Sequence, residues 1–336
     1  MKLCRFRLRP VSPWARQLAS DTLYGLVCWY VAELEGEKAC SELIAAFAAN
    51  AAPFQLSSAM PAGFLPMPVL PPASRKSLRE LAQSQNPADA KDALSRDSAD
   101  RQLFSLLQKY KKFRKAPWLN LQTWQKHNQN LSSLALFLDQ GLEQTADKPE
   151  AGHKPGIEPH VSIDRRTGSA SDGQLFFRRL TYFKPETEFD LYARTDDPQW
   201  LLKYLRLIGE LGFGQDAGTG SGQFEIELDA AFDPETLLLP TGDASLLLSA
   251  CASPKMNDLA GFYKLEVKRG KTGPGQANPF KKPFLLLQEG SVMRALPQGP
   301  YVLGGINADA RIVQILEPLS LPCRLDAREA GHADLD

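Results

Sequence analysis

The chain has 336 residues, enough for two modest domains, and 43% hydrophobic with 23% charged residues is the composition of an ordinary globular protein. No apolar run approaches the ~20 residues that span a bilayer, and the basic start lacks the features of a signal peptide, so we expect a cytoplasmic protein. The net charge is zero, which argues against collecting nucleic acid by long-range attraction alone. Basic residues nevertheless cluster within residues 1–20, 109–115 and 255–282.

The first fifty residues predict a strand and two helices. Residues 2–9 alternate, with Cys4, Phe6 and Leu8 on one face and mostly arginines on the other, which is typical of a half-buried strand. Ser20 is the expected N-cap of a helix that continues to about residue 34, and Asp21 complements its dipole. A second amphipathic helix is expected over residues 38–50.

The next hundred residues predict an insertion, over about residues 50–160. Six prolines between residues 53 and 72 exclude a helix there, so we expect this segment to run extended over a surface. Residues 83–100 predict a mobile loop and residues 144–159 a linker, with helices at 103–114 and 123–142 between them.

Beyond the insertion the pattern returns to strands and one helix. Residues 174–183 predict a strand of aromatic and basic residues, and a helix with one apolar stripe follows from Pro198 to Gly212. A strand at 224–228 and four more at 245–250, 261–268, 283–288 and 311–316 complete the chain. This order predicts an α+β fold, with a ferredoxin-like (RRM-like) sheet in residues 1–238, which include the insertion, and a second, reduced sheet domain at residues 239–336.

The segment between the helix and strand 224–228 is unusually rich in glycine. Five glycines fall within eleven residues, at Gly212, Gly214, Gly218, Gly220 and Gly222. Glycines let backbone amides turn outward together and form an anion-binding nest. Residues 212–217 match GxGxxA, but that dinucleotide fingerprint needs a strand before it and a helix after it, the reverse of the order here. A flexible connector is the competing interpretation.

Several motifs in order resemble a known family. They are the glycine loop, SDTLYGLVC from Ser20, LSSAMPAGFLPMP from Leu56, KYKKFRKAPWLN from Lys109, SIDRRTGSASDGQLFF from Ser162, YKLEVKRG from Tyr263 and KKPFLLLQEGSV from Lys281. Together they resemble the RAMP superfamily of CRISPR proteins, and within it the branch that forms the fourth subunit of the type III-A Csm effector complex.

The resemblance implies a function in antiviral defence. It implies two ferredoxin-like domains, no nuclease centre, binding of the 5′ handle of the guide RNA (crRNA), and contacts with the large polymerase-like subunit and a backbone RAMP subunit. The loop would lie against handle phosphates. Relatives often carry basic residues among these glycines, whereas this chain has Ala217, Ser221 and Gln223, so backbone amides and the hydroxyls of Thr219 and Ser221 would hold the RNA.

Other basic residues are candidates for RNA contact. Arg165 and Arg166 lie in an expected turn beside an aromatic strand, a combination suited to phosphate contact and base stacking. A solvated turn is the alternative. A second cluster comprises Lys255, Lys268, Arg269, Lys271, Lys281 and Lys282. The run at 109–115 is better explained as a solvated helix face.

The sequence offers little for catalysis. Its four histidines lack the spacing of a metal site and its five scattered cysteines suggest reduced, mostly buried thiols, so we expect no metal, no cofactor and no enzyme activity. One alternative is a guide-processing endoribonuclease that uses His160 with Arg165 and Tyr182. Another is the equivalent subunit of a Cmr or III-D complex.

Overall fold

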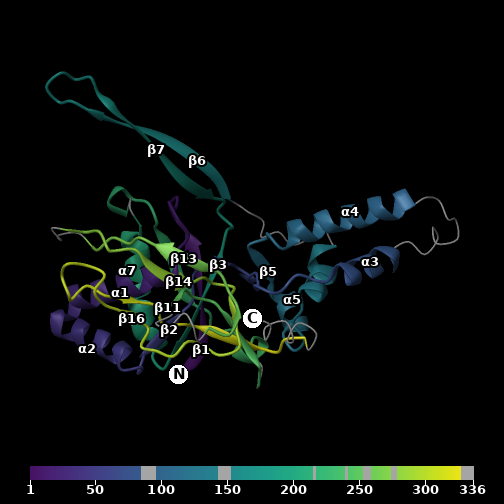
Figure 1. Cartoon of the computed structure of the whole chain (residues 1–336). Coiled ribbons are helices and arrows are strands. Elements are labelled where there is room, and N and C mark those ends of the chain that lie inside the picture. Colours follow the sequence, from purple (N-terminus) through teal and green to yellow (C-terminus); the bar gives the residue numbers. More distant parts are fainter. Residues whose placement is uncertain are drawn as a thin grey trace.

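The computed structural model describes residues 1–84, 96–142, 153–214, 217–238, 241–252, 259–273 and 278–326. Two extensions leave the main body in Figure 1: a long two-stranded hairpin, β6–β7, and a helical arm formed by α3 and α4. The candidate RNA contacts lie on the body and on the hairpin.

The main body is built on one antiparallel sheet. Its strand order is β2 (Phe54–Leu56), β8 (Phe189–Thr195), β1 (Lys2–Pro10) and β9 (Phe224–Leu228), and β3 (Met60–Pro61) also pairs with β8. The predicted strands at 2–9 and 224–228 are therefore confirmed. As the alternation predicts, Phe6 and Leu8 are buried against the helices.

Three helices belong to the body: α1 (Ser20–Glu35), α2 (Glu37–Ala48) and α7 (Pro198–Leu211). α7 begins as its sequence predicts, because the Asp197 side chain accepts a hydrogen bond from the Trp200 amide and Pro198 occupies the first turn. Its apolar stripe is largely buried, although Leu211 at the helix end is 52% exposed.

The expected N-cap of α1 is wrong. Ser20 is the first helical residue, Ala19 precedes it, and no side chain caps the helix. Ser20 is instead buried, where its hydroxyl accepts a hydrogen bond from the Ala250 amide and its own amide donates to Ser58. The serine that we expected to cap the helix therefore joins two segments that are 230 residues apart in the sequence.

The opposite face of the sheet packs on later parts of the chain. Leu3 and Tyr192 join a second core with Leu65 of the insertion and with Leu246 and Val292 of the C-terminal half. The expectation that residues 53–72 cross a surface is wrong, since that segment is extended but buries Phe54, Leu56, Ala59, Met60 and Leu65. β2 and β3 of this segment belong to the main sheet.

The rest of the first half forms the arm and its base. Its elements are β4 (Phe64–Pro66), α3 (Arg75–Ser84), α4 (Arg96–Phe113), β5 (Trp118–Asn120), α5 (Leu121–His127), α6 (Ser133–Leu136) and the π-helical turn η1 (Phe137–Gly141). The predicted helix at 103–114 is confirmed as part of α4. The single helix expected over 123–142 is wrong, because three short elements replace it. The loop expected at 83–100 lies mostly outside the described residues.

The long hairpin consists of β6 (His153–Ile163) and β7 (Ala170–Phe183). The strand expected at 174–183 is confirmed within β7. The linker expected at 144–159 is wrong from residue 153 onward, because β6 begins there. Pro155 and Pro159 led to that expectation because proline cannot donate to an interior ladder. Both strands of an isolated hairpin are edge strands, which tolerate proline.

From residue 241 onward the described residues form strands without an α-helix. The strands are β10 (Ala244–Leu247), β11 (Cys251–Ala252), β12 (Gly261–Phe262), β13 (Leu265–Lys268), β14 (Phe284–Leu287), β15 (Val292–Met293), β16 (Val302–Leu303), β17 (Gln314–Ile315) and β18 (Ser320–Cys323). Turns of 3₁₀ helix precede them at η2 (Ala217–Thr219) and η3 (Pro234–Thr236). Among all described helices, none combines the length and apolarity needed to cross a membrane.

Candidate nucleic-acid interface

The glycine-rich loop between α7 and β9 has a rigid base and an exposed tip. Gly212 and Gly222 are buried, both have positive φ, and the Phe213 amide donates to the Gly222 carbonyl. A Cβ on Gly222 would lie 2.2 Å from the Phe213 oxygen, so this position requires glycine. Gly214, Gly218 and Gly220 are exposed, and a Cβ on any of them would meet open space.

Much of the loop's backbone is already hydrogen-bonded. The amides of Gly212, Phe213, Ala217, Gly220, Gly222 and Gln223 donate to acceptors within the protein. The expected nest therefore does not present every amide outward. The part that can meet a ligand is the tip, residues 214–221, where Thr219 is exposed and Ser221 half-buried. Gln215 and Asp216 lie outside the described residues.

The two classes of glycine predict different responses to substitution. Gly222→Ala should lower the free energy of unfolding by at least ~1–2 kcal/mol, because φ is +80° and the new Cβ would clash with backbone. Gly218→Ala is the matched control and should change stability by less than ~0.5 kcal/mol, since that site is open and its φ is not positive. Urea denaturation measures both, and equal losses would show that the base is not rigid.

A short stretch near the N-terminus, residues 11–14, joins this loop to the long hairpin; we call it the anchor segment. The Gly222 amide donates to the Pro13 carbonyl at 2.9 Å, and the Val11 amide donates to Gln223 at 2.9 Å. On the other side, Trp14 and Thr181 of β7 exchange backbone hydrogen bonds at 3.0 and 2.8 Å. The loop base and the hairpin base are thus held by one piece of backbone.

The Trp14 side chain packs between the same two elements. The indole is 2% exposed. Its ring lies 4.9 Å from Phe183 at the end of β7 and 5.2 Å from Phe213 in the loop, measured between centroids. Phe189 and Phe224 complete the aromatic cluster. These edge-on and tilted contacts fix the loop relative to the hairpin.

Arg165 and Arg166 lie at the far end of the hairpin, as the sequence predicts for a turn. Both are exposed, and the Arg166 amide donates to the Asp164 carboxylate at 2.8 Å. No ion pair of either guanidinium occurs within the described part of the chain. The turn projects these two charges well away from the body (Figure 1).

The hairpin has two chemically different faces, which the sequence reasoning missed. The register places Ile157, Val161, Leu175 and Phe177 on one face, with exposed fractions of 64, 45, 58 and 63%. On the opposite face His160 stacks on Phe176, Arg178 lies over the same ring, and Tyr182 donates a hydrogen bond to Glu158. The alternation of side chains in both strands predicts these two faces, but the prolines of β6 led to the expectation of a linker in place of the first strand.

The second basic cluster separates into paired and exposed residues. Lys268 Nζ lies 2.5 Å from the buried carboxylate of Asp21, so it holds the start of α1. Lys281 donates to Gln314 and the Val313 carbonyl, and burial lowers the pKa of its ammonium group. Arg269, Lys271 and Lys282 are exposed, and Lys271 lies over the Phe280 ring. Lys255 lies outside the described residues.

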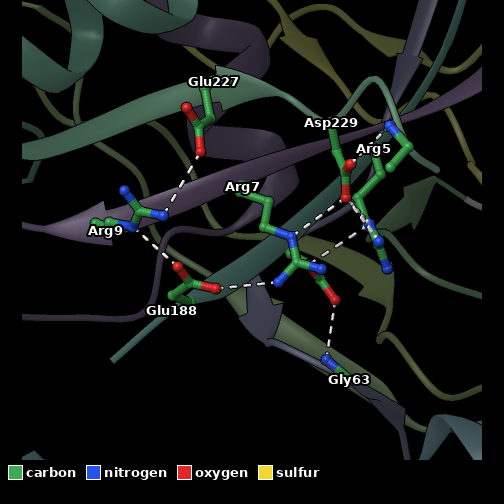
Figure 2. Close-up of polar contacts among 9 residues, drawn as sticks. Arg5, Arg7, Arg9, Gly63, Glu188, Glu227 and Asp229 are labelled. Carbon is green, nitrogen blue, oxygen red and sulfur yellow. Dashed lines mark hydrogen bonds and ion pairs between the residues drawn. The ribbon is translucent and has the colours of Figure 1, made fainter. Parts of the chain in front are cut away.

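The arginines of β1 form an ion network on the sheet. Figure 2 shows Arg5, Arg7 and Arg9 engaged by Glu188, Glu227 and Asp229, and the closest pair is Arg5 with Asp229 at 2.7 Å. Because each of the three guanidiniums already has a carboxylate partner, this face of β1 is locally neutralised.

The trio of the endoribonuclease alternative does not assemble. His160 contacts Glu158 at 3.4 Å, and Tyr182 donates to the same carboxylate, whereas Arg165 lies beyond the end of β6. The hydrogen bond to Glu158 raises the pKa of Tyr182, which makes it a poorer proton donor. Among described residues, no three His, Cys, Asp or Glu side chains are grouped as a metal ion requires.

Comparison with known proteins agrees with this architecture. A family model described as the RAMP superfamily matches residues 68–225. The chain is 24% identical over 329 residues to "CRISPR system Cms protein Csm4" of Thermococcus onnurineus (strain NA1), covering 95% of this chain and 97% of that protein.

Solved structures of similar fold include subunits of two assemblies. One is a crystal structure of a Csm1–Csm4 cassette in complex with pppApA, with a TM-score of 0.55 at 17% identity over 97% of this chain and all of the matched chain. The other is a Csm3–Csm4 subcomplex in the type III-A CRISPR-Cas interference complex, with a TM-score of 0.54 at 17% identity over 95% and 99% of the two chains. At this identity the matches show that this chain shares their fold.

Proposed function

We propose that this chain is a RAMP-superfamily protein and the non-catalytic, RNA-binding subunit of a type III-A CRISPR effector complex. It binds the 5′ handle of the guide RNA and links the large polymerase-like subunit to the backbone RAMP filament. The similarity to Csm4 over nearly the whole length of both proteins supports this assignment, as do the matches to Csm1–Csm4 and Csm3–Csm4 structures. The observation that carries it is the anchor segment, which holds the glycine loop and the aromatic, basic hairpin together.

The proposed architecture is two ferredoxin-like units. In the first, the helix α1 follows β1 and α7 follows β8, and the strand order β2-β8-β1-β9 is that of a βαββαβ sheet. Residues 1–238 form this unit and 239–336 the second, reduced one. Since β2 and β3 pair within the first sheet, the insertion that we placed at 50–160 starts after Pro61.

The surface chemistry suits a single strand of RNA. Phosphates meet the exposed loop tip, where small residues allow close approach, and the charges of Arg269, Lys271 and Lys282. An aromatic side chain on the exposed face of the hairpin, Phe177, provides a surface for a stacked base. Arg165 and Arg166 neutralise phosphates farther along the strand.

The apolar face of the hairpin supports the proposed place in an assembly. A lone two-stranded ribbon is marginally stable in water, and exposed apolar patches mark interaction sites. Ile157, Val161, Leu175 and Phe177 form such a patch. We propose that the neighbouring backbone subunit and the bound RNA together cover this apolar patch.

Salt titration of RNA binding tests the proposal. The purified chain, or its complex, should bind repeat-derived guide RNA with log K falling by ~0.7 per phosphate neutralised for each unit of log salt. The Arg165→Glu and Arg166→Glu double variant should weaken binding at least tenfold and reduce the slope by about 1.4, because two phosphate contacts are lost. The RNA should remain uncut throughout, and cleavage that His160→Ala abolishes would favour the endoribonuclease alternative.

A matched double variant gives the control. Lys38→Glu with Lys76→Glu reverses two exposed charges on α2 and α3, which carry none of the proposed RNA contacts. It should leave the slope unchanged. Equal weakening by the two double variants would mean that RNA is attracted by overall charge, and the proposed contacts of the hairpin turn would be wrong.

A further inference from the structure

The connection between β13 and β14 presents an aromatic ring to solvent; we call residues 269–273 and 278–283 of this connection the β13–β14 loop. Phe280 in this loop is 62% exposed, and a backbone bridge pairs it with Lys271. The Lys271 ammonium group lies over the ring, 5.1 Å from its centroid. Because a ring with this exposure cannot be covered on both faces, the face that Lys271 does not cover is open.

The backbone that carries Phe280 is held on both sides of the loop. The Asn307 side-chain amide donates to the carbonyls of Asn278 and Phe280, each at 3.1 Å. Across the loop, the Trp29 ring of α1 packs on Gly273, where a Cβ would lie 2.6 Å from the nearest ring carbon. The exposed ring is therefore carried by a fixed backbone, which reduces the entropy lost when a partner binds to it.

The charges around the ring determine which partner fits, because an isolated exposed apolar side chain is common in proteins. Three exposed cations belong to the same loop, and none of them forms an ion pair with a described residue. They are Arg269, Lys271 and Lys282. The carboxylate of the loop that supplies Asn307, Asp309, is paired with Arg311 at 2.7 Å. An apolar protein surface would bury these cations without partners, whereas a nucleobase brings phosphates with it.

We propose that Phe280 is a base-stacking site for single-stranded RNA, and that Arg269, Lys271 and Lys282 neutralise the adjacent phosphates. This inference rests on the proposed function and adds the chemical group that the ring holds, a nucleobase. Because every base has a π face, stacking on Phe280 adds affinity and tolerates any base at that position.

Binding of guide RNA to the full-length chain, measured by fluorescence anisotropy, tests the stacking site. Phe280→Ala should weaken binding about five- to a hundredfold and leave the salt slope unchanged, because a stacked base is lost but no phosphate contact. Phe280→Leu should be as weak as Phe280→Ala, since leucine has no π face, whereas Phe280→Trp should bind at least as tightly as wild type. The comparison of leucine with tryptophan decides the question even if Phe280→Ala does not fold.

An exposed ring elsewhere gives the matched control. Phe104 of α4 is 63% exposed, and Phe104→Ala should leave RNA binding unchanged. If Phe280→Leu and Phe280→Trp bind RNA equally, or if Phe280→Ala binds as tightly as Phe104→Ala, the stacking site is wrong and the proposed function still stands. Normal RNA binding by Phe280→Ala together with loss of a protein subunit from the complex would show that the ring contacts a protein instead. A wild-type chain that does not bind guide RNA would overturn both proposals.

An abasic scan identifies the stacked nucleotide. Each nucleotide of the 5′ handle is replaced in turn by an abasic one. At one position the missing base should weaken binding to wild type and have no further effect on Phe280→Ala, because the two changes remove the same contact. Equal effects on both proteins at every position would contradict the stacking site.

Discussion

Replacing Trp14 by alanine is expected to lower the free energy of unfolding by about 3–5 kcal/mol, the range for deleting a large aromatic side chain from a core. The indole is 2% exposed and touches four phenylalanine rings that belong to β7, β8, β9 and the glycine loop. No smaller neighbour can fill the cavity, because these rings are held by separate strands. Urea denaturation of the purified chain gives the value.

A local consequence separates this role from general core packing. Hydrogen exchange should accelerate most at the Thr181 and Gly222 amides, which donate to the anchor segment. Trp14→Phe is the matched control, since it keeps an aromatic ring and loses the indole hydrogen bond to the Gln223 carbonyl and part of the ring volume. It should cost roughly 1 kcal/mol. Uniform acceleration across the whole sheet in Trp14→Ala would contradict the anchoring role.

Arg5→Ala is expected to cost about 3 kcal/mol, the lower end of the range for removing one partner of a buried ion pair. Arg5 donates twice to Asp229 (Figure 2), and its Nε lies 3.9 Å from the fully buried carboxylate of Asp190. Asp229 retains Arg7, so only part of its stabilisation is lost. Asp190 retains the hydrogen bond from the Gly63 amide but loses its nearest charge.

The pH dependence of this loss has a definite sign. Burial raises the pKa of Asp190, and the Gly63 hydrogen bond and Arg5 only partly offset that rise. Without Arg5 the ionised form is disfavoured further, so the deficit should be largest above the raised pKa and shrink as the pH falls through it. Denaturation of the variant and of wild type at several pH values measures this difference.

Two further variants complete this test. Arg9→Ala removes a half-exposed arginine from the same strand face and should cost much less than Arg5→Ala. Asp190→Asn combined with Arg5→Ala should lose less than the sum of the single changes, because the two side chains interact. Additive losses would show that Arg5 acts independently of Asp190, through its bonds to Asp229 and its packing on Phe232.

Local patterns predicted the parts of the fold that local chemistry determines. α7 is an example, since Asp197, Pro198 and Gly212 mark its ends and the apolar stripe marks its buried face. β1 is another. The existence of the glycine loop was also predicted from composition, because five glycines within eleven residues indicate a loop and disfavour a helix or a strand. The division of this loop into a rigid base and an open tip was not predicted, because this division depends on contacts of Phe213 and of the anchor segment.

Features set by distant contacts could not be predicted in the same way. The partner of Lys268 is Asp21, 247 residues away, and no local signal distinguishes this lysine from the exposed Arg269. The burial of residues 53–72 depends on the strands and helices packed around them. β6 was missed because proline usually excludes an interior strand, whereas an isolated hairpin has no interior strand.

The ion pairs of the β1 arginines limit the surfaces on which RNA can bind. The arginines there are committed to carboxylates, so the proposed contacts fall on the loop tip, the hairpin and the exposed part of the second basic cluster. The anchor segment keeps the first two in a fixed relation. A strand that contacts both meets a preformed surface, which reduces the entropic cost of binding.

Photo-crosslinking of the assembled particle, loaded with guide RNA that carries 4-thiouridine through its 5′ handle, tests this account most directly. We predict crosslinks from handle nucleotides to the loop tip at residues 214–221 and to β7 near Phe176 and Phe177. A map in which the handle crosslinks only to other subunits, and to neither of these elements, would contradict the proposed interface.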